Sequence, residues 1–174
     1  PQRLEPERAL AAVLLAEGNL DALEPQLTRL ERAMEAAGRA DPHILVLQAA
    51  ARLSPFSEPT PEDLRRAEAR LREALAARPT LNRARVHLAR LLLETDRPEA
   101  ARAVLAPVLS GAPSHAEAQA LDAEARKALE AARERKETAE AQRAAKKAAA
   151  AKRAAKKASA AKRARPRRPK LDVD

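Results

Sequence analysis

One segment, NRARVHLARLLLETDRPEAARAVLAPVLSGAPSH at positions 82–115, predicts the architecture of the chain. Apolar residues recur in it at helical spacing in two runs. The first run includes Leu88 and Leu92, and the second includes Ala101 and Leu105. Two short helices joined by a tight turn are therefore expected.

The turn between the two runs is Asp96-Arg97-Pro98. Asp96 is predicted to cap the second helix, since Glu99 follows three residues later and proline is favoured in a first helical turn. The segment then forms a helical hairpin.

Small, apolar and proline residues recur at an interval of 34 residues, which indicates a repeated hairpin. The residues of one copy are Ala67, Leu71, Ala74, Leu75 and Pro79, and those of the next are Ala101, Leu105, Val108, Leu109 and Pro113. Small residues let neighbouring helices approach closely, and the proline ends the second helix.

This pattern resembles the tetratricopeptide repeat family, most clearly over residues 42–115. The family's large–small pair falls on Leu88 and Ala89, and its closing proline on Pro113. Arg85 departs from the pattern, because the family often has tryptophan there. The resemblance implies an all-α, right-handed solenoid of helical hairpins that binds a protein partner.

The rest of the domain follows from the same register. Three hairpins are expected at about 4–38, 42–77 and 81–110, with an insertion at 54–60. A capping box beginning at Ser114 predicts a seventh helix that covers the last hairpin. Residues 1–130 therefore form a helical repeat domain with a C-terminal capping helix.

Charge divides the chain differently from its apolar pattern. The net charge is +9, but residues 1–140 hold 21 Lys or Arg against 23 Asp or Glu. Residues 141–174 hold 13 Lys or Arg against Asp172 and Asp174. Residues 131–174 are therefore a Lys/Arg/Ala-rich tail, either extended helix or disordered. Repulsion between like charges favours disorder beyond about residue 140 in the free protein.

The tail predicts a polyanionic partner. Its composition is similar to the Lys/Ala-rich tails of linker histones and of some bacterial nucleoid proteins. DNA or RNA would be bound through phosphates without sequence specificity, because nothing in the tail reads base edges. An acidic protein, an anionic membrane surface, or a solvated tail with no partner stay open. The candidate polyanion-binding residues are Lys146, Lys147, Lys152, Arg153, Lys156, Lys157, Lys162, Arg163, Arg165, Arg167 and Arg168.

The resemblance also implies where a protein partner would bind. Ligand contacts in this family come mainly from the first helix of each hairpin. In this chain those positions are Arg8, Leu45, Arg52, Arg83, His87 and Arg90, with the apolar residues Ala12, Ala49 and Val86 among them. Arginines among small apolar residues suit an acidic peptide, since guanidinium pairs with carboxylate. The alternative is that these arginines only face solvent.

Composition argues against catalysis and against cofactors. The chain has no cysteine, three glycines and one aromatic residue, Phe56. Glycine-rich phosphate loops and thiolate metal sites are thus excluded. His43, His87 and His115 lie in different segments without metal-ligand spacing. We expect no enzyme activity, no cofactor and no metal site.

No stretch of 18 apolar residues occurs, so no transmembrane helix is expected. The cytoplasm is favoured, and an exported location stays open if an upstream signal was removed. The leading hypothesis is a non-enzymatic adaptor or scaffold that holds a protein in its groove and attaches its tail to an anionic partner. The alternative is a nucleic-acid-binding or nucleoid-associated protein whose activity resides in the tail.

Overall fold

A computed structural model describes residues 4–54 and 58–163, with side chains described as far as residue 153. Phe56 lies outside this part of the chain. The elements within the described residues are seven helices: α1 (Glu5–Glu17), α2 (Leu20–Ala37), α3 (Pro42–Arg52), α4 (Pro61–Ala77), α5 (Asn82–Glu94), α6 (Pro98–Gly111) and α7 (Ala116–Arg163).

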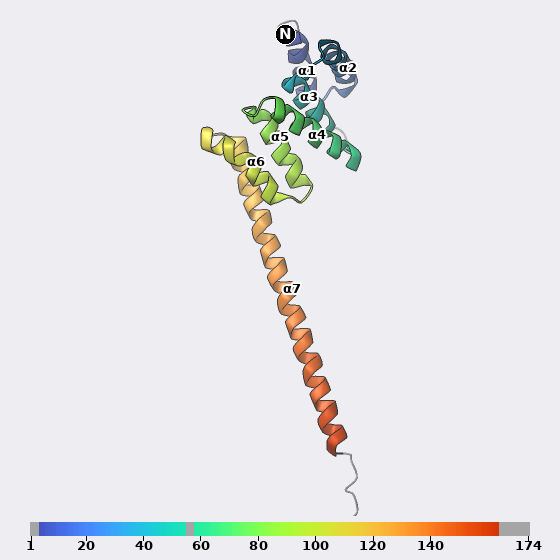
Figure 1. Cartoon of the computed structure of the whole chain (residues 1–174), viewed down its shortest axis with the longest axis vertical. Coiled ribbons are helices and arrows are strands. Elements are labelled where there is room, and N and C mark those ends of the chain that lie inside the picture. Colours follow the sequence, from blue (N-terminus) through green and yellow to red (C-terminus); the bar gives the residue numbers. More distant parts are fainter. Residues whose placement is uncertain (1–3, 55–57, 164–174) are drawn as a thin grey trace, which may run out of the picture. The chain divides into compact units, whose positions relative to one another are not determined.

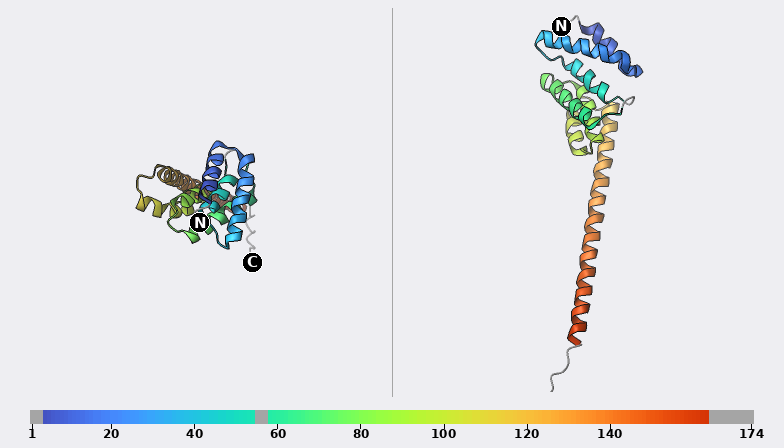
Figure 2. Two further views of the ribbon diagram at one scale, coloured as in Figure 1. Left: turned by 90° about the horizontal axis from the view of Figure 1, so that it is seen from above. Right: turned by 90° about the vertical axis from the view of Figure 1, so that its right-hand side faces the viewer.

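Helices α1 to α6 form three successive hairpins (Figures 1 and 2). Each hairpin packs on the next, because α2 contacts α3 and α4 contacts α5. The first helices of the hairpins also follow one another, since α3 contacts both α1 and α5. This is the predicted all-α solenoid of helical hairpins.

The interval of 34 residues is visible as equal burial at equivalent positions. Ala67, Leu71 and Ala74 of α4 are 0% exposed, and so are their counterparts in α6, which are Ala101, Leu105 and Val108. A buried alanine leaves room for the neighbouring helix, and a buried leucine fills the space beside it. The repeat inferred from the sequence is therefore a repeat of packing.

The ends of the two helices repeat as well. Arg78 ends α4 with φ −143° and ψ 88°, and Ala112 ends α6 with φ −141° and ψ 78°. The Arg78 N–H donates to the carbonyl of Ala74 at 2.9 Å, and the Ala112 N–H donates to that of Val108 at 2.8 Å. One turn geometry thus serves both hairpins.

Several helix boundaries follow from local capping. Asp41 accepts a hydrogen bond from the His43 N–H at the start of α3, and Thr60 forms a capping box with Asp63 at the start of α4. Gly38 ends α2 with φ 62°, a left-handed conformation that glycine adopts without strain.

Two predicted caps are wrong. Asp96 has a positive φ of 56°, so it forms the left-handed turn after α5, and Arg97 precedes α6 without a side-chain cap. The helix after Ser114 begins at Ala116, where the ring Nδ1 of His115 accepts from the Ala118 N–H at 3.3 Å. The ring of His115, one residue closer to the helix, therefore takes the capping role predicted for Ser114.

The chain divides into two units, Pro1–Leu129 and Glu130–Asp174. In the first unit, Ala118 and Leu121 of α7 belong to the apolar core with the residues of α1 to α6. In the second unit, residues 132–153 are exposed. Within the described residues, no helix combines the length and apolar character that crossing a membrane requires.

The prediction of disorder beyond about residue 140 differs from the structure, in which α7 is helical as far as Arg163. Alanine, lysine, arginine and glutamine all favour helix, and alanine does so most strongly. A like-charge pair such as Lys152 and Lys156 costs only about 0.2–0.5 kcal/mol. Helix propensity summed over the segment accounts for this conformation.

Candidate functional site

A groove of about 250 Å³ lies between the first helices of the three hairpins. We call it the α1/α3/α5 groove. Apolar side chains form part of its lining, and charged and imidazole side chains form the rest. Its lining residues are Glu5, Arg8, Ala9, Ala12, His43, Val46, Leu47, Leu81 and Arg83.

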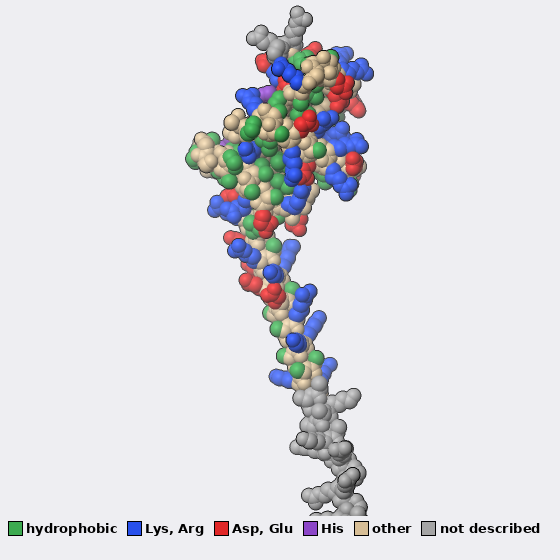
Figure 3. Space-filling view, in the orientation of Figure 1, with side chains coloured by type: hydrophobic (Ala, Val, Ile, Leu, Met, Phe, Trp, Pro, Cys, Tyr) green, Lys and Arg blue, Asp and Glu red, His purple; other side chains and the backbone are tan. Residues whose placement is uncertain are grey.

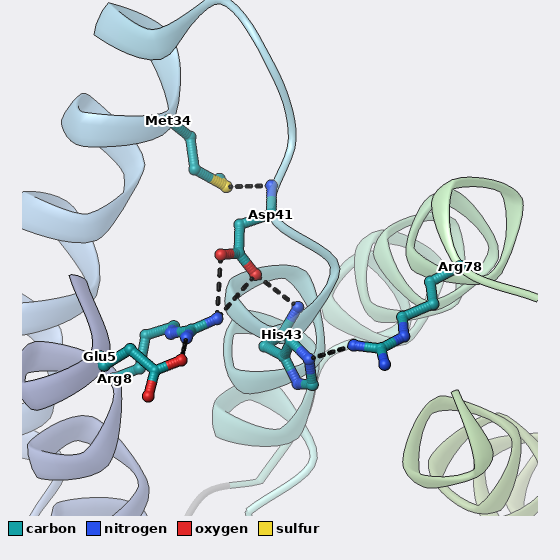
Figure 4. A network of polar contacts seen from close by, with 6 residues as sticks. All are labelled: Glu5, Arg8, Met34, Asp41, His43 and Arg78. Carbon is teal, nitrogen blue, oxygen red and sulfur yellow. Dashed lines mark hydrogen bonds and ion pairs between the residues drawn. The ribbon is translucent and has the colours of Figure 1, made fainter. Parts of the chain in front are cut away.

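Arg8, a predicted binding residue, lies in this groove but is already paired. Its Nη1 donates to Oδ1 of Asp41 at 3.3 Å and to Oδ2 at 3.0 Å, and its Nη2 donates to the carboxylate of Glu5 (Figure 4). The Arg8 side chain is only 17% exposed. Its guanidinium therefore joins α1 to the start of α3, and its charge is balanced within the protein.

His43 lines the groove and contacts Arg78 (Figure 4). Its Nε2 lies 3.0 Å from an Nη1 of Arg78. A guanidinium can only donate, so Nε2 accepts, and the neutral imidazole carries its proton on Nδ1. The contact fixes the tautomer of this ring.

Arg83, His87 and Arg90 share one face of α5, because they are spaced four and three residues apart. Arg90 donates to Glu117 of α7 at 2.7 Å. Arg83 is exposed and forms no ion pair with another described residue. Among the predicted groove arginines, it is the one whose charge stays unbalanced in the described part of the chain.

His87 is partly buried between these arginines. Burial, aided by the positive charges of Arg83 and Arg90 and opposed by Glu117, lowers the pKa of His87 to about 4. The imidazole is therefore neutral at pH 7 and adds no positive charge to this face of α5.

Three predicted apolar contacts prove to be core residues. Leu45 and Ala49 are 0% exposed, and Val86 is also buried. The reason is that α3 contacts α1, α2, α4 and α5, so little of its surface is left for a ligand. The prediction that Leu45 faces the groove is therefore wrong.

Arg52 also lies away from the α1/α3/α5 groove. It borders a different pocket, between α2, α3 and α4, and its guanidinium donates to Asp63 at 2.9 Å. Of the six predicted groove residues, the structure places only Arg8 and Arg83 in the groove lining itself.

The lining also includes six residues that the sequence pattern did not assign to a binding surface: Glu5, Ala9, His43, Val46, Leu47 and Leu81. Asp41-Pro42 identifies the start of α3 in the sequence, so His43 could have been placed in its first turn. Val46 and Leu47 are themselves buried in the core and only border the groove, so nothing in the sequence distinguishes them from the other apolar residues that pack inside.

The structure describes some of the predicted polyanion-binding residues in full, some by their backbone alone and some not at all. Lys146, Lys147, Lys152 and Arg153 are exposed on α7, and Figure 3 shows basic side chains along this helix. The backbone of α7 includes Lys156, Lys157, Lys162 and Arg163, but Arg165, Arg167 and Arg168 lie outside the described residues. No group of three His, Asp or Glu side chains in the described residues is arranged to hold a metal ion.

A comparison with protein families gives a match over residues 61–125, from α4 to the first turns of α7, and the matching family is the tetratricopeptide repeat. The predicted resemblance is confirmed. No curated protein and no solved structure matches the chain. Tetratricopeptide repeats indicate a role in protein–protein interaction, as an adaptor or scaffold. The groove residues on α1 and α3 lie before residue 61, outside the matched segment, whereas Leu81 and Arg83 lie within it.

Proposed function

We propose that the protein is a non-enzymatic adaptor whose α1/α3/α5 groove binds a peptide segment of a protein partner. The observation that supports this most is the combination of apolar lining residues with an unpaired cation. Ala9, Ala12 and Leu81 offer apolar surface, and the exposed Arg83 lies beside them without an ion-pair partner among the described residues.

The groove favours a particular kind of peptide. Its volume of about 250 Å³ suits one small or medium apolar side chain. A neighbouring carboxylate of the peptide would pair with Arg83, the kind of contact in which guanidinium gives two parallel hydrogen bonds. Arg8, Arg52 and Arg90 already pair with carboxylates of the protein itself. A partner peptide therefore needs fewer acidic residues than four free arginines would require.

Fluorescence anisotropy with a library of labelled peptides tests this proposal. The peptides carry one apolar residue beside either a glutamate or a lysine. Arg83→Glu should weaken binding of the glutamate series by about tenfold or more, since a charged hydrogen-bonded pair contributes about 1.5–3 kcal/mol. The control is Arg29→Glu, which changes an exposed arginine of α2 that lines no described pocket.

Ala12→Trp provides a second test, because it fills the groove without changing charge. Both variants should keep the helical circular dichroism of the parent. Equal binding by the parent, Arg83→Glu and Ala12→Trp would place the partner surface elsewhere.

For the tail, we propose attachment to an anionic partner, with duplex DNA or RNA as the first to test. Supporting this are the exposed cations of α7, such as Lys146, Lys147 and Lys152, and the absence of any acidic residue between Glu140 and Asp172. Deleting 141–174 distinguishes the two parts. An adaptor keeps its peptide ligand after this deletion, whereas a protein that acts only through nucleic acid loses its activity.

A further inference from the structure

We propose that a second pocket, at the junction of α2 and α3, binds an oxyanion, either a carboxylate or a phosphate, carried on a short aliphatic group. This pocket has a volume of about 370 Å³. We call it the junction pocket, and its polar lining residues are Arg39, Asp41, His43 and Arg78. The proposal is independent of what the α1/α3/α5 groove binds.

The first argument is an excess of positive charge. Arg39 and Arg78 line the pocket, and neither forms an ion pair with another described residue. The carboxylate that lines the pocket belongs to Asp41. It already accepts hydrogen bonds from Arg8 and from the His43 backbone N–H, at 3.0 and 2.8 Å. Arg8 also pairs with Glu5, so Glu5, Arg8 and Asp41 together carry one net negative charge. Arg39 and Arg78 outweigh it and leave one net positive charge at the pocket.

The second argument is the orientation of Arg78. Its Nη1 donates to His43, a neutral acceptor, and Figure 4 shows its side chain extended toward that ring. A guanidinium has five N–H donors in one plane, so Nε and Nη2 keep donors for a ligand. His43 thereby holds a cation in place without neutralising it, which lowers the entropy cost of binding an anion.

The third argument is the apolar wall beside these cations. Ala33, Met34, Ala37 and Pro42 line the same pocket. Met34 is buried, and its sulfur accepts from the Asp41 N–H at 3.3 Å, which holds the thioether in place. A free inorganic ion would leave this wall unused, whereas an aliphatic group attached to the anion would cover it.

The dimensions of the pocket restrict its ligand to a single head group. A polyanion such as a duplex needs a row of cations along its backbone, and the exposed tail provides one. The junction pocket instead brings two arginines to one cavity. The ligand expected there is one oxyanion on a small molecule or on a peptide side chain.

Two-dimensional ¹H–¹⁵N NMR on the full chain tests the proposal. Inorganic phosphate and butyrate are added separately at constant ionic strength, adjusted with chloride. The signals followed are the backbone amides of Ala40 and His43 and the side-chain Nε–H of Arg78. We expect saturable shifts at all three. A response to butyrate alone indicates a carboxylate ligand, and a response to phosphate alone indicates a phosphate ligand.

Three variants make the result specific. Arg78→Gln and Arg39→Gln should each weaken binding by about tenfold or more, because each removes a charged donor. Arg32→Gln removes an exposed arginine of α2 that lines no described pocket, so it should bind like the parent. Arg39 lies in the loop after α2 and provides the second variant if Arg78→Gln fails to fold.

Two results would overturn the proposal. One is shifts that rise linearly with either probe and never saturate, since these indicate general ionic effects. The other is equal weakening by Arg32→Gln and Arg78→Gln. Binding of a probe by the tail would not produce these shifts, because the three signals belong to residues of the junction pocket.

Discussion

Single alanines decide how closely the helices of this protein approach one another. Ala67 and Ala101 occupy equivalent positions one repeat apart, and both are completely buried. A larger side chain at either position has no space to occupy without separating two helices.

Ala67→Arg or Ala101→Arg should therefore unfold the repeat domain. Each places an unpaired charge inside the core, at a cost of several kcal/mol against a total stability of about 5–15 kcal/mol. Thermal unfolding followed by circular dichroism measures the effect. The matched controls are Ala69→Arg and Ala103→Arg, which change exposed alanines of the same helices and should melt like the parent. Unchanged melting of Ala67→Arg and Ala101→Arg would refute the repeat register.

His87 gives a second prediction at the scale of one residue, through its lowered pKa of about 4. The ordinary value is 6.5, so between these values the unfolded chain binds more protons than the folded one. The contribution of His87 to the free energy of unfolding is thus fully present above pH 6.5 and is lost as the pH decreases toward 4. In His87→Gln this part of the acid sensitivity should disappear, as melting temperatures measured from pH 7 to 4 can show. A profile identical to that of the parent would contradict the burial of the ring.

At the scale of whole helices, ion pairs join elements that are distant in sequence. Arg97, before α6, binds Glu68 of α4 through two parallel hydrogen bonds of 3.1 and 2.6 Å. Arg72 also pairs with Glu68, at 2.7 Å. The hydrogen bond from Arg97 is the main cause of the lowered pKa of Glu68, and burial opposes it. The second and third hairpins are thus linked by an ion pair that requires the Glu68 carboxylate to be ionised.

This link predicts the response of the hairpin interface to acid. A carboxylate whose pKa is lowered in the folded protein contributes stability above its unfolded value of 4.5, and that contribution is lost as the pH falls further. Glu68→Gln should lower stability at pH 7 by about 1–3 kcal/mol and flatten the loss below pH 4.5. Urea unfolding at pH 7 and pH 3.5 measures both effects. Glu94→Gln is the control, because Glu94 is exposed and forms no ion pair within the described residues.

A similar contact anchors the first turns of α7. Asp122 is 7% exposed and pairs with Arg102 of α6 and with Arg126. Burial raises its pKa, but the hydrogen bonds from the two arginines outweigh burial, and the net pKa is lowered. The beginning of α7 is therefore part of the folded domain, in agreement with the burial of Ala118 and Leu121.

At the scale of the whole chain, stability and net charge belong to different segments. The core residues lie between Ala11 and Leu121, whereas 13 of the 34 Lys and Arg lie in 141–174. Removal of 141–174 should leave the melting temperature nearly unchanged, because the described residues of that segment are exposed. A large decrease would show that the tail contributes to the core.

The tail also predicts a strong dependence of nucleic-acid binding on salt. If about six to eight cations contact phosphates, log K should fall with log[salt] at a slope of about −5 to −7. Affinity should differ little between duplex sequences, and electrophoretic mobility shifts at several salt concentrations measure both. Absence of binding at ~50 mM salt, or tight binding that survives high salt, would contradict this interpretation and indicate an acidic protein or a membrane instead.

Local sequence was enough to predict the hairpins. The helical spacing of apolar residues, the cap at Asp41 and the terminating Gly38 depend on residues close to one another in the chain. Their physical effects, helix periodicity and satisfaction of backbone N–H groups, act over one or two turns. For this reason the helix bounds followed from the sequence to within a few residues.

The binding surface depended on contacts that no local pattern contains. Arg8 meets Asp41 across 33 positions, and Arg90 meets Glu117 across 27. Leu45 faces the core because α3 is contacted by four other helices. Whether a cation is available to a ligand is set by the distance to its nearest carboxylate, which arises only once the helices have packed.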